Sequence, residues 1–85
     1  MRMPAELYDY MLIAIRTRLP YIEEYRRHLI SLGTVRDVEK RLRWDLAYDA
    51  IGSRWICDNV YPLGMNDTHI DTALKQIMRT LSKEG

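Results

Sequence analysis

The chain has no phenylalanine, a single cysteine and no long uninterrupted run of apolar residues. Cys57 alone cannot form an internal disulfide, and its apolar neighbourhood predicts a buried, inert thiol in a reducing compartment. No segment is long and apolar enough for a membrane-spanning helix, and Glu6 and Asp9 interrupt the start where a signal peptide would be apolar. These absences exclude a disulfide scaffold and predict a cytoplasmic protein with no membrane partner.

The chain also lacks a strong net charge, because thirteen basic side chains oppose twelve acidic ones. This balance excludes an acidic mimic of nucleic acid and gives no general attraction to DNA or membranes. The charges are nevertheless unevenly spread. Basic residues dominate from Arg16 to Arg43, whereas aspartates dominate from Asp45 to Asp71. We therefore expect a basic side and an acidic side.

Apolar residues recur at steps of three and four through the first third of the chain, which is the spacing of one helix face. The members of this stripe are Leu7, Met11, Ile15, Leu19, Ile22, Tyr25, Leu29 and Leu32. The stripe keeps its phase across Pro20, so we predict one long helix that is kinked near Pro20 and stops at Gly33. Two helices joined at Leu19 and Pro20 are the alternative, which we consider weaker because the joint is very short for a reversal.

The segment that follows Gly33 is apolar on two sides of a helical wheel. One side consists of Val35, Val38, Leu42 and Leu46, and the nearly opposite side of Trp44, Ala47, Tyr48, Ile51 and Trp55. A helix of this kind is sandwiched between neighbours or offers one side to a partner. Thr34 and Asp37 resemble a capping box at its start. Whether the segment is one helix or breaks at Gly52, with Ser53 as a new cap, stays open.

A last helix is predicted after the loop of Pro62, Leu63 and Gly64. Asn66 or Asp67 is placed to cap it, and its apolar stripe consists of Ile70, Leu74, Ile77 and Leu81. We find no repeat and no alternation typical of a strand. The sequence therefore predicts one all-α domain over residues 1–85, a small bundle of three to four helices. Its thin core leaves a homodimer open.

Motifs for metal binding and catalysis are missing. His28, Cys57 and His69 are the only soft ligands, and they are scattered over three segments without the close pairing that tight sites use. There is no glycine-rich phosphate loop and no serine nucleophile motif. We therefore expect no metal, no cofactor and no enzymatic activity.

Two aspartate pairs offer one enzymatic alternative. Asp45 and Asp49 lie one helical turn apart, and so do Asp67 and Asp71. Facing pairs of this kind could hold magnesium in a metal-dependent hydrolase. Sites of that class use glutamates, whose longer side chains let the carboxylates converge, so we interpret these aspartates as caps and solvated charges.

A second alternative is a nucleic-acid-associated accessory protein that uses the basic side. The residues able to contact phosphates are Arg26, Arg27, Arg36, Lys40 and Arg43. Acidic residues such as Glu23 and Glu39 are interleaved at helical spacing and neutralise this side. A solvated face with ion pairs is therefore the preferred interpretation.

Six tyrosines and two tryptophans suit a protein contact surface, because Tyr, Trp and Arg are enriched in the centres of interfaces. They equally suit the edge of the core, where tyrosine hydroxyls reach water. So many tyrosines cannot all be buried in a core of this size. Trp44, between Arg43 and Asp45, is expected at the surface. Trp55, close to Ile56, is expected in the core.

Two stretches in the second half of the chain carry a resemblance. Residues 43–48 read Arg-Trp-Asp-Leu-Ala-Tyr, and residues 63–74 read Leu-Gly-Met-Asn-Asp-Thr-His-Ile-Asp-Thr-Ala-Leu. Together they resemble a pattern in small uncharacterised proteins of phages and prophages, in which an Arg-Trp-Asp segment precedes a tyrosine-containing loop and an Asn-Asp-x-His-Ile-Asp-Thr-Ala-Leu helix start. The resemblance implies no activity. It implies a mobile-element setting, in which small helical proteins bind and inhibit host restriction or CRISPR complexes.

We therefore predict a non-enzymatic protein-interaction module of the anti-defence type. The candidate partner-binding residues are Arg43, Trp44, Asp45, Tyr48, Tyr61, His69 and Asp71. Within the resemblance, His69 and Asp71 are expected to meet Arg43 or Trp44 of the third segment.

Overall fold

A computed structural model describes residues 2–33 and 35–84, and the side chains of all of these except residues 35–37. The elements are α1 (Ala5–Thr17), α2 (Leu19–Leu32), α3 (Val35–Asp45), the π-helix η1 (Leu46–Gly52), α4 (Ser53–Asn59), the 3-10 helix η2 (Tyr61–Leu63) and α5 (Asp67–Glu84). No strand occurs among the described residues. Since α3, η1 and α4 follow one another directly, the described residues form a small all-α bundle of four helices, which confirms the predicted fold class.

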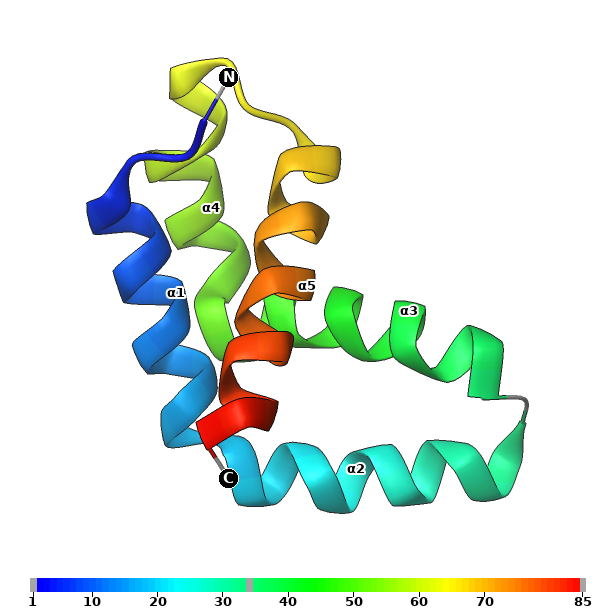
Figure 1. Cartoon of the computed structure of the whole chain (residues 1–85). Helices are drawn as coiled ribbons and strands as arrows, with labels where there is room; N and C mark the ends of the chain where they lie inside the picture. The colour runs from blue at the N-terminus through cyan, green and yellow to red at the C-terminus, as the bar shows by residue number, and fades with distance from the viewer. Residues whose placement is uncertain (1, 34, 85) are drawn as a thin grey trace.

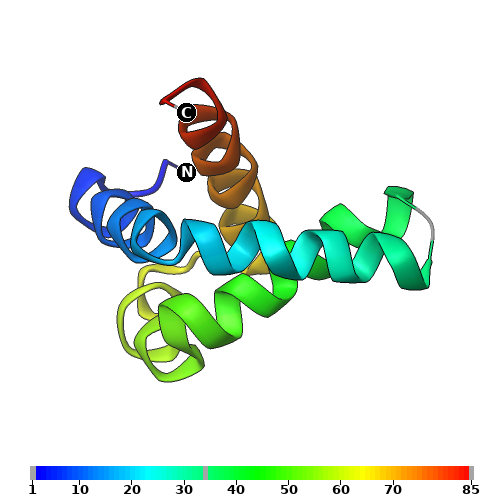
Figure 2. The same cartoon turned by 90° about the horizontal axis from the view of Figure 1, so that it is seen from below.

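The helices form a bundle with an arm. In Figure 1, α1, α4 and α5 stand side by side, while α2 and α3 extend together to one side. The view from below in Figure 2 shows the same arm leading away from the bundle. The molecule measures 38 × 24 × 20 Å along its principal axes. The run from α3 into η1 joins the two parts, because α3 packs against α2 and α5 and η1 packs against α1.

The prediction of one long helix kinked near Pro20 is wrong. Helix α1 ends at Thr17, Arg18 leaves the helical conformation with φ −106° and ψ 12°, and α2 begins at Leu19. Pro20 lies in the first turn of α2, where its missing N–H is not needed by the helix. The two helices run in different directions (Figure 1), so the alternative of two helices holds. The kink lies instead at Val60, in the joined run of helices that begins with α3.

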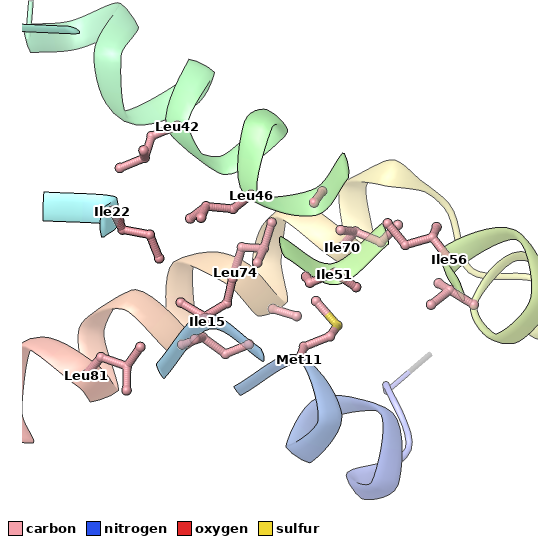
Figure 3. Close-up of a cluster of buried hydrophobic side chains, with 14 of the residues drawn as sticks. Met11, Ile15, Ile22, Leu42, Leu46, Ile51, Ile56, Ile70, Leu74 and Leu81 are labelled. Atoms are coloured by element: carbon pink, nitrogen blue, oxygen red, sulfur yellow. The ribbon is translucent and has the colours of Figure 1, made fainter. Parts of the chain in front are cut away.

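The apolar stripes predicted for the first third of the chain and for the last helix nevertheless supply much of the core. The apolar residues buried in it are Met11, Ile15, Ile22, Leu29, Val38, Leu42, Leu46, Ala47, Ile51, Ile56, Val60, Met65, Ile70, Ala73, Leu74, Ile77 and Leu81. Figure 3 shows how members from α1, α5 and η1 converge. Leu32 is 70% exposed, so the first stripe leaves the core at the tip of the arm. No polar or charged residue is buried in the described part of the chain.

The third segment is one helical run that changes its backbone conformation at Gly52 without a loop, a point that the sequence left open. Gly52 has φ +99° and ψ 125°, a backbone conformation that residues other than glycine rarely adopt. Ser53 is then the first residue of α4 and makes no capping hydrogen bond. The capping box expected from Thr34 and Asp37 lies outside the described residues.

Asn66 is the residue that caps α5. Its side-chain oxygen accepts hydrogen bonds from the backbone N–H groups of Thr68 at 3.0 Å and His69 at 3.3 Å. In return, the Asn66 N–H donates to Nδ1 of His69 at 3.0 Å. This reciprocal arrangement is that of a capping box, with histidine in place of the usual glutamate. It fixes the start of α5 and leaves the Asp67 side chain for another contact.

The positive φ of Gly52 gives the first prediction. Gly52→Ala should lower the free energy of unfolding by about 1–3 kcal/mol, because a Cβ strains this backbone conformation although no atom crowds it. Gly33→Ala is the matched control, since Gly33 is extended at φ −165° and has equally open surroundings. Urea denaturation followed by circular dichroism measures both variants. Equal stabilities of the two would contradict the strain at Gly52.

Candidate functional site

Trp44 and Tyr48 form an aromatic pair on the surface. Their ring centroids are 5.9 Å apart with planes inclined by 13°, and the residues are 37% and 49% exposed. The stack spans the boundary between α3 and η1, so it belongs to the side of the third segment that the sequence predicted for a neighbour or a partner. The surface position of Trp44 agrees with the prediction. Trp55 is partly buried and stacks on Tyr10 at a centroid distance of 4.3 Å.

Tyr61 extends this surface from the turn before α5. It is 39% exposed, and its hydroxyl donates a hydrogen bond of 2.5 Å to Oδ1 of Asp67. That hydrogen bond, together with burial, raises the pKa of Tyr61 to about 12. Asp67 lines a small crevice together with Trp44, so the bond from Tyr61 to Asp67 brings Tyr61 to the same surface. We call Trp44, Tyr48 and Tyr61 the aromatic face.

An ion pair anchors the aromatic face to α5. Nε of Arg43 lies 2.5 Å from Oδ1 of Asp71, and Nζ of Lys75 lies 3.4 Å from the other oxygen. Burial opposes the charge of Asp71, but the bond and charge of Arg43 outweigh it, so the pKa of Asp71 is lowered. Arg43 and Asp71 are mostly shielded, with side chains 16% and 30% exposed. This shielding makes the pair firmer than a surface ion pair.

The contact between α3 and α5 beneath the aromatic face is tightly packed. Arg43, Trp44, Asp67 and Asp71 surround a crevice of only about 10 Å³. Trp44 therefore lies against the start of α5 with one part of its ring and faces outward with the rest. A tryptophan held in this way loses little conformational freedom when a partner covers it.

The structure brings together five of the seven candidate residues and separates two. Asp45 turns toward α2, where its Oδ2 accepts a hydrogen bond of 2.6 Å from the Tyr25 hydroxyl. That bond raises the pKa of Tyr25. His69 caps the start of α5 and lines the groove between α1 and α5. Neither residue belongs to the aromatic face.

Ion pairs neutralise two of the candidate residues on the basic side. Arg26 pairs with Glu23 and, at 2.8 Å, with Glu39. Burial works against its charge, but these two hydrogen bonds prevail and raise the pKa of Arg26. Arg43 pairs with Asp71, as described above. Arg27 and Lys40 are exposed, and the side chain of Arg36 lies outside the description.

The prediction of a buried thiol is wrong, because Cys57 is exposed. Its neighbour Ile56 takes the buried position of this helix turn, which turns Cys57 outward. Among residues whose side chains are described, no three His, Cys, Asp or Glu lie close enough together to hold a metal ion. Three of the four paired aspartates are engaged elsewhere: Asp45 with Tyr25, Asp67 with Tyr61 and Asp71 with Arg43.

The comparisons with known proteins assign no family and no function to the chain. No family model, no curated protein and no solved structure matches the chain. Within residues 2–33 and 35–84, no helix combines the length and the hydropathy needed to cross a membrane.

Sequence reasoning missed Asp67 as part of this surface and Tyr25 as the partner of Asp45. Asp67 is six residues from Tyr61 across a tight turn, a spacing that could have indicated their contact. Tyr25 and Asp45 are twenty residues apart on different helices, so no local pattern joins them.

The second prediction concerns alkaline pH. The pKa of Tyr61 is raised above its ordinary value of 10, so its bond to Asp67 stabilises the fold fully below pH 10 and is lost as pH rises toward 12. Asp67→Asn removes the negative charge and should move the pKa of Tyr61 back toward 10. Tyrosinate absorbance during an alkaline titration measures this shift, and Tyr61→Phe identifies the transition. Glu24→Gln, an exposed change on α2, is the control. An unaltered titration in Asp67→Asn would contradict the contact.

Proposed function

We propose that this chain is a non-enzymatic protein-interaction module that binds its partner through the aromatic face. The observation that carries the proposal is the joint exposure of Trp44, Tyr48 and Tyr61 on a surface fixed from below by the Arg43–Asp71 pair. Tryptophan, tyrosine and arginine are the residues most often responsible for interface energy.

The size of the aromatic face supports a central anchor rather than a complete interface. At their exposures of 37–49%, the three residues present roughly 250–300 Å² of surface. Covering that area contributes about 6–8 kcal/mol before the costs of association. Stable complexes bury about 800 Å² on each partner. The partner therefore also contacts surface around the aromatic face.

Pre-organisation also favours this surface. The rings of Trp44 and Tyr48 support each other, and the Tyr61 hydroxyl is held by Asp67. Side chains that are already ordered lose less entropy on binding than mobile ones. The exposed apolar residues elsewhere, such as Ile13 and Leu32, have no comparable polar support within the described residues.

The anti-defence role belongs to this proposal through the resemblance to phage and prophage proteins. A small inhibitor needs no catalytic group, only a rigid surface that occupies a functional site of its target. The ordered and exposed rings of the aromatic face support this proposal, because they offer a surface of that kind. Tests of inhibition on restriction or CRISPR complexes should follow identification of the partner.

The third prediction concerns Trp44. Trp44→Ala should weaken partner binding by about 2 kcal/mol or more, the scale of an interface hot spot, and cost comparatively little folding free energy. The tagged chain would capture proteins from the native host, which mass spectrometry identifies, and the variants would then be titrated with the purified partner. Ile13→Ala is the control, since Ile13 is 59% exposed on α1 and lies off the aromatic face. A Trp44→Ala protein that melts far below wild type would instead assign the residue to the core.

The fourth prediction separates this proposal from nucleic-acid binding. Combined substitution of Arg27→Ala and Lys40→Ala should leave partner binding intact and change stability by about 0.5 kcal/mol or less, because both side chains are exposed. Affinity for the partner should also fall only modestly as salt is raised. A steep loss with salt, together with loss of function in the double variant, would favour phosphate contacts instead.

A further inference from the structure

A second concave site lies on the other side of the same central segment. A cleft of about 390 Å³ opens between α2 and the junction of α3 with η1. Its apolar lining includes Ile22, Leu42 and Leu46, which belong to the core. Tyr21 and Tyr25, one helical turn apart on α2, also line it. The volume is within the range of ligand pockets, and the site is separate from the aromatic face.

The polar groups of the cleft are mainly hydrogen-bond acceptors. The carboxylate of Asp49 makes no hydrogen bond or ion pair to any side chain that the structure describes, and Asp49 is exposed. Asp45 uses Oδ2 for the Tyr25 hydroxyl at 2.6 Å, and Arg41 approaches the same atom only at 3.9 Å. Its Oδ1 is left without a bond in the described chain. The cleft thus offers acceptors on two carboxylates beside two aromatic rings.

Among the described residues that line the cleft, Arg18 is the one cation, and the backbone of η1 holds it. Nη1 of Arg18 donates to the backbone carbonyl of Asp49 at 2.8 Å, not to a carboxylate. Arg18 therefore helps to fix η1 against the start of α2. Neither carboxylate of the cleft is closely neutralised by it.

We propose that this cleft receives an arginine side chain of a partner protein. The aliphatic stem of arginine matches the apolar lining, and its planar guanidinium can stack on Tyr21 while it donates to Asp45 and Asp49. A lysine lacks the planar group that would satisfy the ring and both carboxylates together. The proposal goes beyond the aromatic face and does not depend on it.

The test uses two capped pentapeptides, Gly-Ala-Arg-Ala-Gly and the same sequence with citrulline, which keeps the shape of arginine without its charge. Nuclear magnetic resonance of the labelled chain would follow the signals of Tyr21, Asp49 and Ala50. The arginine peptide should shift these signals and bind about tenfold or more tightly than the citrulline peptide, because the charged hydrogen bonds are lost in the latter. Equal affinities, or shifts located elsewhere, would overturn the proposal.

Variants make the test specific. Asp49→Asn should reduce arginine-peptide affinity by about tenfold. It should leave thermal stability unchanged, since the Asp49 side chain bonds to no described residue. Asp58→Asn, another exposed carboxylate that lies outside the cleft, should bind as wild type does. Trp44→Ala should also bind the peptide normally. Loss of peptide binding in Trp44→Ala would locate the peptide at the aromatic face and overturn the cleft assignment. If the peptide binds normally but Trp44→Ala does not weaken partner binding, only the proposed function is contradicted.

Discussion

The structure depends on the burial of two opposite sides of one helical run, from α3 through η1 to α4. Leu42 and Leu46 pack toward the arm and the bundle, while Ala47 and Ile51 are buried within the bundle. A short chain has few other helices to cover both sides, so each of α1, α2 and α5 is committed to this run. The wider turns of η1 and the positive φ of Gly52 let the run redirect its side chains between these neighbours. Because no helix remains to cover Trp44 and Tyr48, they stay at the surface.

Polar contacts then fix how the helices are placed relative to one another. The Arg43–Asp71 pair ties α3 to α5, and the Tyr61–Asp67 bond ties the turn before α5 to its first residue. Both acidic partners come from the first turns of α5, where negative charge is favoured by the helix dipole. On the opposite side, the Tyr25–Asp45 bond joins the arm to the same run. Two different surfaces therefore lie on either side of a single segment. One is the aromatic face, and the other is the cleft, which combines tyrosines with carboxylates.

The sequence predicted those features that depend on periodicity or on near neighbours. The stripes of α1 and α5, the all-α class and the two-sided third segment follow from spacing, and a cap at Asn66 or Asp67 follows from local hydrogen-bonding chemistry. The continuous first helix was predicted wrongly, because phase is maintained across Arg18 although the axis turns there. Cys57 was misplaced, since its apolar neighbours do not report which side of a short helix points inward. Contacts between distant segments, such as Tyr25 with Asp45, are set by tertiary packing and carry no local signal.

The most direct measurement of where the partner binds is the pair of indole N–H signals in the ¹⁵N-labelled chain, recorded with and without the captured partner. The chain has two tryptophans, and Trp44→Phe assigns their signals. If the aromatic face is the contact surface, the Trp44 signal shifts on binding, whereas that of Trp55, stacked on Tyr10, stays in place. An unchanged Trp44 signal in a saturated complex would contradict the account and locate the interface elsewhere on the molecule.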